Sequence, residues 1–352
     1  MTDLPGKLGN PEATFETDPR ADRRIAAAMA MLGALGGEAE PISPDAPYEE
    51  LLAYCQGFED ASAEGNAAMW EMMPNFDDIE ETTQVIQGVD GNDIMLYIHR
   101  PKGVTGPLPC VVHTHGGGMV LMTAADPMFC RLRNTLARSG LVVVGVEFRN
   151  GGGRLGPHPF PAGLNDCAVA TRWVYANRED LGVGKIVISG ESGGGNLCIA
   201  TTLKAKQEGW MDEIAGVYAM CPYISGQYAD PPHALTSLRE NDGYMLDCAQ
   251  MAALVRVYDP QGTNNTNPLA WPLHSRTEDL AGLPPHVISV NELDPLRDEG
   301  LAFYRKLLAA GVPSVGRTVM GTPHAGDQMM PDVTPDISNE LINSISGFAR
   351  AL

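Results

Sequence analysis

The chain of 352 residues carries 44 aspartate and glutamate residues against 24 lysine and arginine residues, a formal net charge of −20. This acidity argues against nucleic acid or an anionic membrane surface as a partner, because both are negatively charged. The longest apolar runs fall short of a membrane span, so we expect no membrane insertion. The length suits one large α/β domain with an accessory piece.

The seven cysteines are scattered, odd in number and without a C-x-x-C pair or a Cys/His cluster. This pattern indicates neither a disulfide framework nor a zinc site. Several of them lie in apolar runs, where a thiol behaves as a small buried side chain. We therefore expect no metal, no cofactor and a reducing, cytoplasmic location.

The first 81 residues predict helices and loops rather than strands. Residues 23–37 open with two arginines and an apolar run and so resemble an export signal, but a long acidic stretch precedes them. An Asp-Pro pair at 18–19 predicts the start of a helix and a Gly-Gly pair at 36–37 its end, so we interpret the run as an amphipathic helix. A second helical pattern runs on to about residue 73. We expect residues 1–81 to form the N-terminal segment of a helical lid or cap.

Strands begin at residue 82 and soon alternate with helices. An Asp-Gly pair between residues 82–88 and 93–100 favours a tight hairpin. Repeated strand–helix units specify a mostly parallel central sheet with helices on both faces. The further strands are expected at 109–114, 141–148, 186–188, 214–221, 286–290 and 314–319, and the helices at 126–139, 165–177, from 196 onward, 299–310 and 337–351.

The alternation is interrupted between about residues 222 and 284. This stretch is rich in proline, asparagine and aspartate and has one helical run near residues 245–257. An insertion after a core strand can fold over the sheet together with the N-terminal segment. We therefore expect a catalytic domain over residues 82–352, in which residues 222–275 are an insertion that contributes to the cap.

A serine stands at a sharp turn between a strand and a helix. In Gly-Glu-Ser-Gly-Gly, residues 190–194, glycines lie two positions before and after Ser192. A strand, a strained turn and a helix form the context in which G-x-S-x-G exposes a nucleophilic Oγ above a sheet. The alternative is a glycine-rich loop that cradles a phosphate, but no P-loop lysine stands near Ser192.

A serine nucleophile needs a base, a carboxylate that orients the base, and N–H donors for the developing oxyanion. His-Gly-Gly-Gly at residues 115–118 follows an early strand, as the oxyanion loop of lipases and esterases does. We predict that Gly117 and Gly118 donate their N–H groups together with Gly193, and that Gly116 is mainly conformational.

The carboxylate is expected just beyond the strand at 286–290. Asp294 is followed by a proline, which stops the strand, and we favour it. Its rivals are Glu292, expected within the strand, and Asp298, expected at a helix start. We predict His324 as the base, because it lies in a small-residue loop after the last strand. The order Ser, Asp, His is that of α/β-hydrolases.

Taken together, these motifs resemble the hormone-sensitive-lipase family of α/β-hydrolases, from about residue 84 to the C-terminus. The sequence at residues 190–197, 240–244 and 291–295 is similar to that of the brefeldin A esterase branch of the family. The resemblance implies an α/β-hydrolase fold, a carboxylesterase activity and a helical cap. The chain departs from the common Gly-Asp-Ser-Ala-Gly at Glu191 and Gly193. Further matches are His-Pro-Phe-Pro-Ala at 158–162, Leu-Ala-Gly-Leu-Pro-Pro at 280–285 and Asp-Pro-Leu-Arg-Asp-Glu-Gly at 294–300.

We therefore predict two-step acyl transfer from a small-molecule ester or lactone to water. Met119, Trp271 and Met329 are the candidate substrate-binding residues, with simple packing of the cap on the body as the alternative. Two other functions are an amidase that uses the same triad and a catalytically silent ligand-binding protein on the same fold. The sequence leaves a homo-oligomer, the acyl length and the choice of ester or lactone open.

Overall fold

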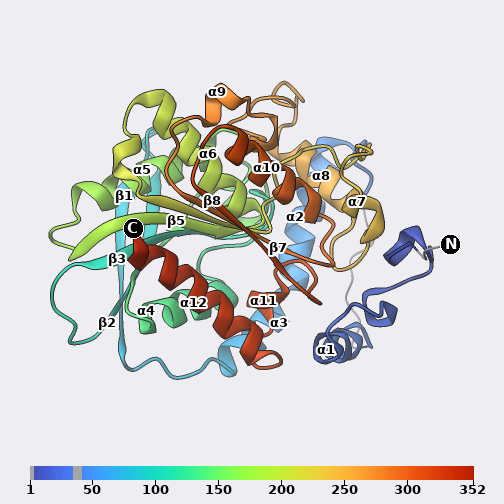
Figure 1. The fold of residues 1–352 in the computed structure, drawn as a ribbon, viewed down its shortest axis with the longest axis horizontal. Coiled ribbons are helices and arrows are strands. Elements are labelled where there is room, and N and C mark those ends of the chain that lie inside the picture. The colour runs from blue at the N-terminus through green and yellow to red at the C-terminus, as the bar shows by residue number, and fades with distance from the viewer. Residues whose placement is uncertain (1–3, 35–41) are drawn as a thin grey trace.

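In the computed structural model, which describes residues 4–34 and 42–352, one sheet of eight strands runs between two helical layers (Figure 1). The strand order is β1-β2-β4-β3-β5-β6-β7-β8. Only β2 runs against its neighbours, since it pairs antiparallel with both β1 and β4, and every other pair is parallel. The strands are β1 (Ile79–Gln87), β2 (Asp93–Pro101), β3 (Leu108–Thr114), β4 (Val142–Glu147), β5 (Val183–Glu191), β6 (Gly216–Met220), β7 (His286–Asn291) and β8 (Ser314–Val319). The mostly parallel sheet predicted from the sequence is thus confirmed.

The central strands read as apolar runs because both of their faces are covered. Val111, Val143 and Val187 lie in register on one face, while Val112 and Val144 lie on the other. The first face packs on α4 (Pro127–Arg138) and α12 (Pro335–Ala351), and the second on α5 (Ala162–Ala176), α6 (Gly193–Glu208) and α10 (Arg297–Ala309). The carboxyl ends of the parallel strands therefore meet at one edge of the sheet.

The β1–β2 hairpin is confirmed, but its turn is longer than a tight two-residue connection. Gln87 pairs with Asp93, and the Gly88 N–H donates to the Asn92 carbonyl at 2.7 Å. Gly91 has a φ of 77°, which is the left-handed region that glycine tolerates. The five residues between the strands thus close as one loop.

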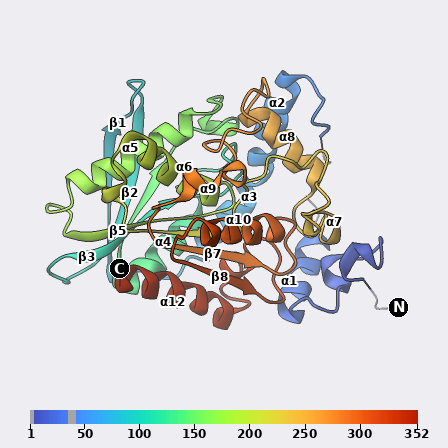
Figure 2. The ribbon, with the colours of Figure 1, turned by 45° about the horizontal axis from the view of Figure 1, so that its top comes forward.

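The N-terminal segment and the chain after β6 lie against each other although they are far apart in sequence (Figure 2). α2 (Tyr48–Ala61) packs on α8 (Cys248–Tyr258), and Gln250 donates a hydrogen bond to the Tyr54 hydroxyl at 2.9 Å. α3 (Ala63–Glu71) contacts α4. The division into residues 1–81, residues 82–352 and an insertion at 222–275 stays a prediction.

The predicted start of the first helix is wrong. α1 (Arg23–Ala34) begins beyond the Asp18–Pro19 pair, because the Asp18 carboxylate has other partners. It accepts hydrogen bonds from the backbone N–H and the guanidinium of Arg20 and from the Tyr244 hydroxyl. The expected stop at residues 36–37 lies outside the described residues.

No strand occurs between β6 and β7 among the described residues, as the interrupted pattern predicted. The helical run expected from residue 245 begins later, at Cys248, because Met245 has a φ of 75° and Asp247 caps the helix. The Asp247 carboxylate accepts the N–H groups of Ala249 and Gln250, which satisfies donors at the start of the helix. The shorter helices α7 (Ser237–Glu240), α9 (Thr277–Leu280) and α11 (Gly326–Met329) escaped the sequence analysis.

All seven cysteines are free and buried. Burial raises the pKa of their thiols, for example at Cys130 and Cys221, because a thiolate is poorly solvated in the interior. Among the helices of the described chain, none combines the length and the apolar character needed to span a bilayer.

A buried carboxyl in the first turn of α10 supports the chain that leaves β6. Glu299 is 1% exposed, and its Oε1 accepts hydrogen bonds from the N–H groups of Ile224 and Ser225 and from the Tyr228 hydroxyl, at 2.6, 3.2 and 2.9 Å. Burial raises the pKa of Glu299 from 4.5 to about 7 despite these donors. Between these two values the folded protein holds more protons than the unfolded chain, so stability must fall as the pH rises.

Replacing Glu299 with glutamine should remove this pH dependence. Between about pH 5 and pH 8, the free energy of unfolding of the wild type should fall by up to about 3 kcal/mol more than that of Glu299→Gln. Urea unfolding across this pH range measures the difference, since all other titrating groups are common to both proteins. Parallel pH profiles for the two proteins would contradict the prediction.

Candidate active site

Ser192 lies at the turn from β5 into α6 in a conformation that non-glycine residues rarely adopt. Its φ is 56° and its ψ is −119°. The turn is held by backbone hydrogen bonds on both sides: the Ser192 N–H donates to Met220 at 3.0 Å, and its carbonyl accepts from Tyr223 at 3.1 Å. Such a conformation costs about 1–3 kcal/mol and persists only where its surroundings enforce it. Ser192 is partly exposed between two buried neighbours, as expected of a nucleophile at this turn.

The turn can be this sharp because α6 approaches β3 very closely. A Cβ on Gly194 would lie 1.9 Å from the carbonyl oxygen of Thr114. The Thr114 hydroxyl also donates to the Gly194 carbonyl at 2.9 Å. Glycine at this position is therefore a packing requirement, which explains the second glycine of the G-x-S-x-G sequence.

The His-Gly-Gly-Gly loop is tethered at its first glycine and left-handed at the next two. The Gly116 N–H donates to the Glu191 carboxylate at 2.9 Å, and the same carboxylate contacts His113 Nε2 at 3.0 Å. Gly117 and Gly118 have φ values of 94° and 63°. The backbone conformation that favours glycine thus occurs at Gly117 and Gly118, whereas we had expected the conformational role at Gly116. Glu191, noted in the sequence only as a departure, fixes the loop beside Ser192.

The backbone of this loop faces the residue after Ser192. A Cβ on Gly193 would lie 2.7 Å from the nitrogen of Gly118 and 2.5 Å from that of Met119. Within the described chain, the N–H groups of Gly117, Gly118 and Gly193 have no protein hydrogen-bond partner. Donors without partners beside a serine Oγ are what an oxyanion requires.

His115, the first residue of the loop, has a structural place. Its ring stacks on Phe148 with centroids 4.2 Å apart, and its Nδ1–H donates to the Gly116 carbonyl at 2.9 Å. Burial lowers the pKa of His115 to about 3, so the ring is neutral.

The structure brings Asp294 and His324 together at the same edge of the sheet. Asp294 follows β7 and is fully buried, and its Oδ2 accepts a hydrogen bond from His324 Nδ1 at 2.8 Å. The other oxygen accepts the Leu296 N–H at 2.9 Å. Burial alone would lower the pKa of His324, but the Asp294 carboxylate outweighs burial and raises it well above its usual value. The bond fixes the tautomer that leaves Nε2 free.

The two rival carboxylates bind elsewhere. Glu292 lies one residue beyond β7, not within it as expected, and accepts the Gly321 N–H at 2.8 Å. Asp298 lies in the first turn of α10, as expected, and accepts the Ser237 N–H at 2.8 Å. Of the three candidates, only Asp294 contacts the imidazole.

Ser192 and His324 both adjoin the chain that leaves β6. The Ser192 N–H binds Met220, while the thiol of Cys221 lies within 4.8 Å of ligand atoms of both Asp294 and His324. Among the described residues no hydrogen bond joins Ser192 to His324, and such bonds often tighten only once a substrate is present. Sequence reasoning treated Cys221 as part of a buried strand. Its place directly after β6, at the edge shared with Ser192, is the signal that was missed.

A second missed residue ties α2 to the loop after Gly118. Glu59 is 6% exposed, and its two carboxylate oxygens accept the N–H groups of Met122 and Arg154, both at 2.7 Å. One carboxylate thus joins the N-terminal segment to the oxyanion-type loop and to the glycine-rich stretch before Arg154.

The candidate substrate-binding residues lie in different surroundings. Met119 directly follows Gly118 and is 1% exposed. Trp271 is fully buried, 5.6 Å between ring centroids from both Tyr223 and Tyr258. Met329 is half-buried at the end of α11. Their contact with a substrate stays a prediction, and two surface cavities of about 360 and 310 Å³ include none of the three.

Comparison with known proteins identifies the relatives of the chain. The profile of a family described by the alpha/beta hydrolase fold matches residues 111–327. The solved structure of brefeldin A esterase, a bacterial homologue of human hormone-sensitive lipase, superposes with a TM-score of 0.92 at 44% identity, covering 98% of each chain. Carboxylesterase NlhH of Mycobacterium tuberculosis is 35% identical over 69% of this chain and 73% of that protein. Esterase LipI of the same organism is 35% identical over 58% of this chain, a match that spans 61% of that relative.

Replacing Asp294 with asparagine should lower the pKa of His324, because the Asp294 carboxylate is the largest of the influences that raise it. Burial then acts without the opposing carboxylate, so the imidazole is neutral over a wider range of pH. The titration of the His324 ring protons, followed by NMR, measures this change. Asp332→Asn, at an exposed carboxylate paired with Arg131, serves as the control and should leave the titration unchanged. An unchanged pKa in Asp294→Asn would contradict the assigned pairing.

Proposed function

The chain belongs to the family with the alpha/beta hydrolase fold, and on this premise we propose that it is a carboxylesterase that cleaves small-molecule esters through Ser192, His324 and Asp294. One observation carries the proposal: a strained, partly exposed serine and a buried Asp–His pair occupy the same edge of the sheet. No activity besides acyl transfer makes equal use of these three groups and of free N–H donors beside the serine.

The first half of the reaction acylates the enzyme. His324 Nε2 accepts the hydroxyl proton of Ser192 as Oγ attacks the ester carbonyl, and Asp294 stabilises the imidazolium that forms. The oxyanion of the tetrahedral intermediate accepts hydrogen bonds from the N–H groups of Gly117, Gly118 and Gly193. His324 then gives its proton to the alcohol oxygen, the bond between carbonyl carbon and alcohol oxygen breaks, and the alcohol leaves.

Water completes the cycle. His324 accepts a proton from a water molecule, whose oxygen attacks the acyl carbon and again forms an oxyanion held by the same donors. When the intermediate collapses, His324 returns the proton to Ser192 Oγ, and the carboxylic acid is released. Each step uses Asp294 in the same way, as the fixed negative charge opposite Nδ1. Neither a metal nor a cofactor enters these steps.

We infer that the substrate binds at the carboxyl edge of the sheet, beside the helices α2 and α8. These helices come from the two segments predicted to form the cap, residues 1–81 and 222–275, and they pack on each other. Met119, Trp271 and Met329 supply apolar surface to the pocket in this proposal. The acidic surface favours esters and lactones that are neutral or cationic.

We also place the protein in the cytoplasm. The support is its cysteine chemistry: all seven thiols are free, and a reducing compartment keeps them so.

Replacing Ser192 with alanine should reduce the hydrolysis of p-nitrophenyl esters by at least about 10⁴-fold, because the nucleophile of both half-reactions is lost. Initial rates across a series of acyl lengths measure the loss and report the depth of the acyl pocket. Circular dichroism confirms that the variant is folded.

Three results would contradict the esterase proposal. A wild-type protein inert on every ester and lactone but able to bind small apolar molecules would be a silent ligand-binding protein. Preferential cleavage of the matched anilides would indicate an amidase. Retained ester hydrolysis in Ser192→Ala would exclude Ser192 as the nucleophile.

Alanine is common at position 193 in the family that the chain resembles, but the loop of this chain lies too close to accept it. Replacing Gly193 with alanine should lower kcat by roughly 10- to 100-fold, since the added Cβ would push the Gly118 and Met119 backbone out of place and misdirect the oxyanion donors. KM should change little. Gly347→Ala is the matched control, because a Cβ at this position in α12 meets nothing within 4 Å. Unchanged kcat in Gly193→Ala would show that the loop accommodates the methyl group.

A further inference from the structure

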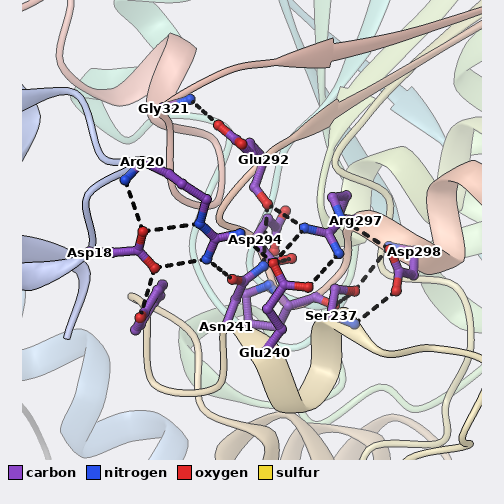
Figure 3. A network of polar contacts seen from close by, with 12 residues as sticks. Asp18, Arg20, Ser237, Glu240, Asn241, Glu292, Asp294, Arg297, Asp298 and Gly321 are labelled. Atoms are coloured by element: carbon purple, nitrogen blue, oxygen red, sulfur yellow. Dashed lines mark hydrogen bonds and ion pairs between the residues drawn. The ribbon is translucent and has the colours of Figure 1, made fainter. Parts of the chain in front are cut away.

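The N-terminal residues 18–22 contact the loop that carries His324 directly and the loop that carries Asp294 through Glu240 and Asn241. Figure 3 shows the second of these connections. The Asp22 N–H donates to the carbonyl of Gly321, three residues before His324, at 2.9 Å. Arg20 extends to Glu240 and Asn241, which adjoin the Asp294 loop. A segment from the start of the chain thus touches both members of the Asp–His pair through intermediates.

Asn241 connects this segment to the backbone of the Asp294 loop. Its side chain is fully buried, and its Oδ1 accepts a hydrogen bond from Arg20 at 3.2 Å. Its amide nitrogen donates to the carbonyl of Asp294 at 3.1 Å and to that of Glu292 at 3.3 Å. One side chain therefore holds the loop on both sides of Leu293.

Glu240 joins two arginines in the same network. Its carboxylate binds Arg20 on one side and both terminal nitrogens of Arg297 on the other, the latter at 3.0 and 2.9 Å. Arg297 also donates to the Glu292 carbonyl at 2.9 Å. Burial alone would raise the pKa of Glu240, but the hydrogen bonds from Arg297 and Arg20 outweigh it and lower the pKa, so the carboxylate stays charged.

The two loops are also bonded to each other. Glu292 Oε2 accepts the Gly321 N–H at 2.8 Å, and the Leu293 N–H donates to Thr322 at 3.0 Å. Beneath them, an apolar cluster packs Phe15 and Ile25 of the N-terminal segment against Leu293. The contacts of Arg20 and Asn241 therefore bear on a unit that includes both Asp294 and His324.

We propose that Arg20 and Asn241 are positioning residues for the catalytic pair. They hold the backbone of Asp294 in the position from which its carboxylate binds His324 Nδ1. This inference rests on the proposed esterase function. It adds that the N-terminal segment is part of the machinery that sets the basicity of His324. A purely structural role of the same contacts would affect the amount of folded protein and leave the chemistry of each folded molecule unchanged.

The direction of a pH shift separates a positioning role of Arg20 from a purely electrostatic effect of its charge, and a purely structural role gives no shift. The titratable groups that face His324 are Asp294, Cys221 and Asp327, and a substitution at Arg20 alters none of them. Loss of the Arg20 charge alone would make His324 easier to protonate and move the acidic limb of kcat/KM to higher pH. A loosened Asp294 contact does the opposite and moves this limb to lower pH.

The experiment compares Arg20→Met with Arg24→Met. Arg24 lies in the same segment and also pairs with carboxylates, those of Asp22 and Asp336, but it is half-exposed and contacts neither catalytic loop. We expect kcat for a p-nitrophenyl ester to fall by about 10-fold or more in Arg20→Met, with KM within about twofold of the wild type. The acidic limb of kcat/KM should move to lower pH. Arg24→Met should match the wild type, and Arg20→Lys, which keeps the charge, should recover part of kcat.

A second variant covers the case in which Arg20→Met does not fold. Asn241→Ala leaves every charge paired while it removes the donors to the Asp294 and Glu292 carbonyls. The same loss of kcat and the same shift of the acidic limb are expected. Unchanged kcat and pH profile per folded molecule in either variant, or a shift to higher pH, would overturn the proposal.

A spectroscopic measurement keeps this test separate from the esterase proposal. The proton between His324 Nδ1 and Asp294 Oδ2 gives a downfield NMR resonance, identified by its loss in His324→Ala. We expect this resonance to move upfield or to broaden through solvent exchange in Arg20→Met and Asn241→Ala but not in Arg24→Met. An inert wild type would refute the esterase function and leave this readout intact. An unchanged resonance would refute the positioning role even in an active enzyme.

Discussion

The strained turn at Ser192 is the constraint on which the rest of the site depends. A left-handed, non-glycine residue holds its conformation only when both flanking elements are fixed. Here they are a strand whose last six residues are buried and a helix packed closely on β3. The parallel sheet supplies this rigidity, because its central strands are covered on both faces and cannot shift. It also brings the ends of β6, β7 and β8 to the same edge, where Cys221, Asp294 and His324 lie.

Much of this arrangement could be predicted because it follows from local chemistry. Continuous apolar runs identified the central strands. The glycines around Ser192 identified a sharp turn, because glycine is required where a strand and a helix approach each other closely. Pro295 separated Asp294 from Glu292, and the structure pairs Asp294 with the imidazole. The sequence signal for each of these features lies within a few residues of the feature itself.

The parts that sequence reasoning missed depend on partners far away in the chain. Asp18 has the character of a helix cap, yet Tyr244 and Arg20 engage its carboxylate, so the helix starts later. Glu191 looked like a simple replacement, but its function is to hold Gly116 and His113. Glu59 has no sequence signal at all, because the groups that it binds are backbone N–H groups. Tertiary partners of this kind override local helix propensity, and one stretch of sequence does not reveal them.

The contact between Arg20 and Glu240 spans 220 residues of sequence. Closing so long a loop costs conformational entropy before the contact can contribute any stability. Such pairings therefore form late in folding. On a ribosome, residues 18–22 emerge first but must wait for Glu240 and then Gly321 to be synthesised. The nucleophile turn, whose partners all lie between β3 and Tyr223, can be complete well before that. The order of synthesis thus delays the last adjustment of the Asp–His pair until Gly321 has been synthesised. The nascent protein therefore has a complete serine turn before the N-terminal segment can position its catalytic base.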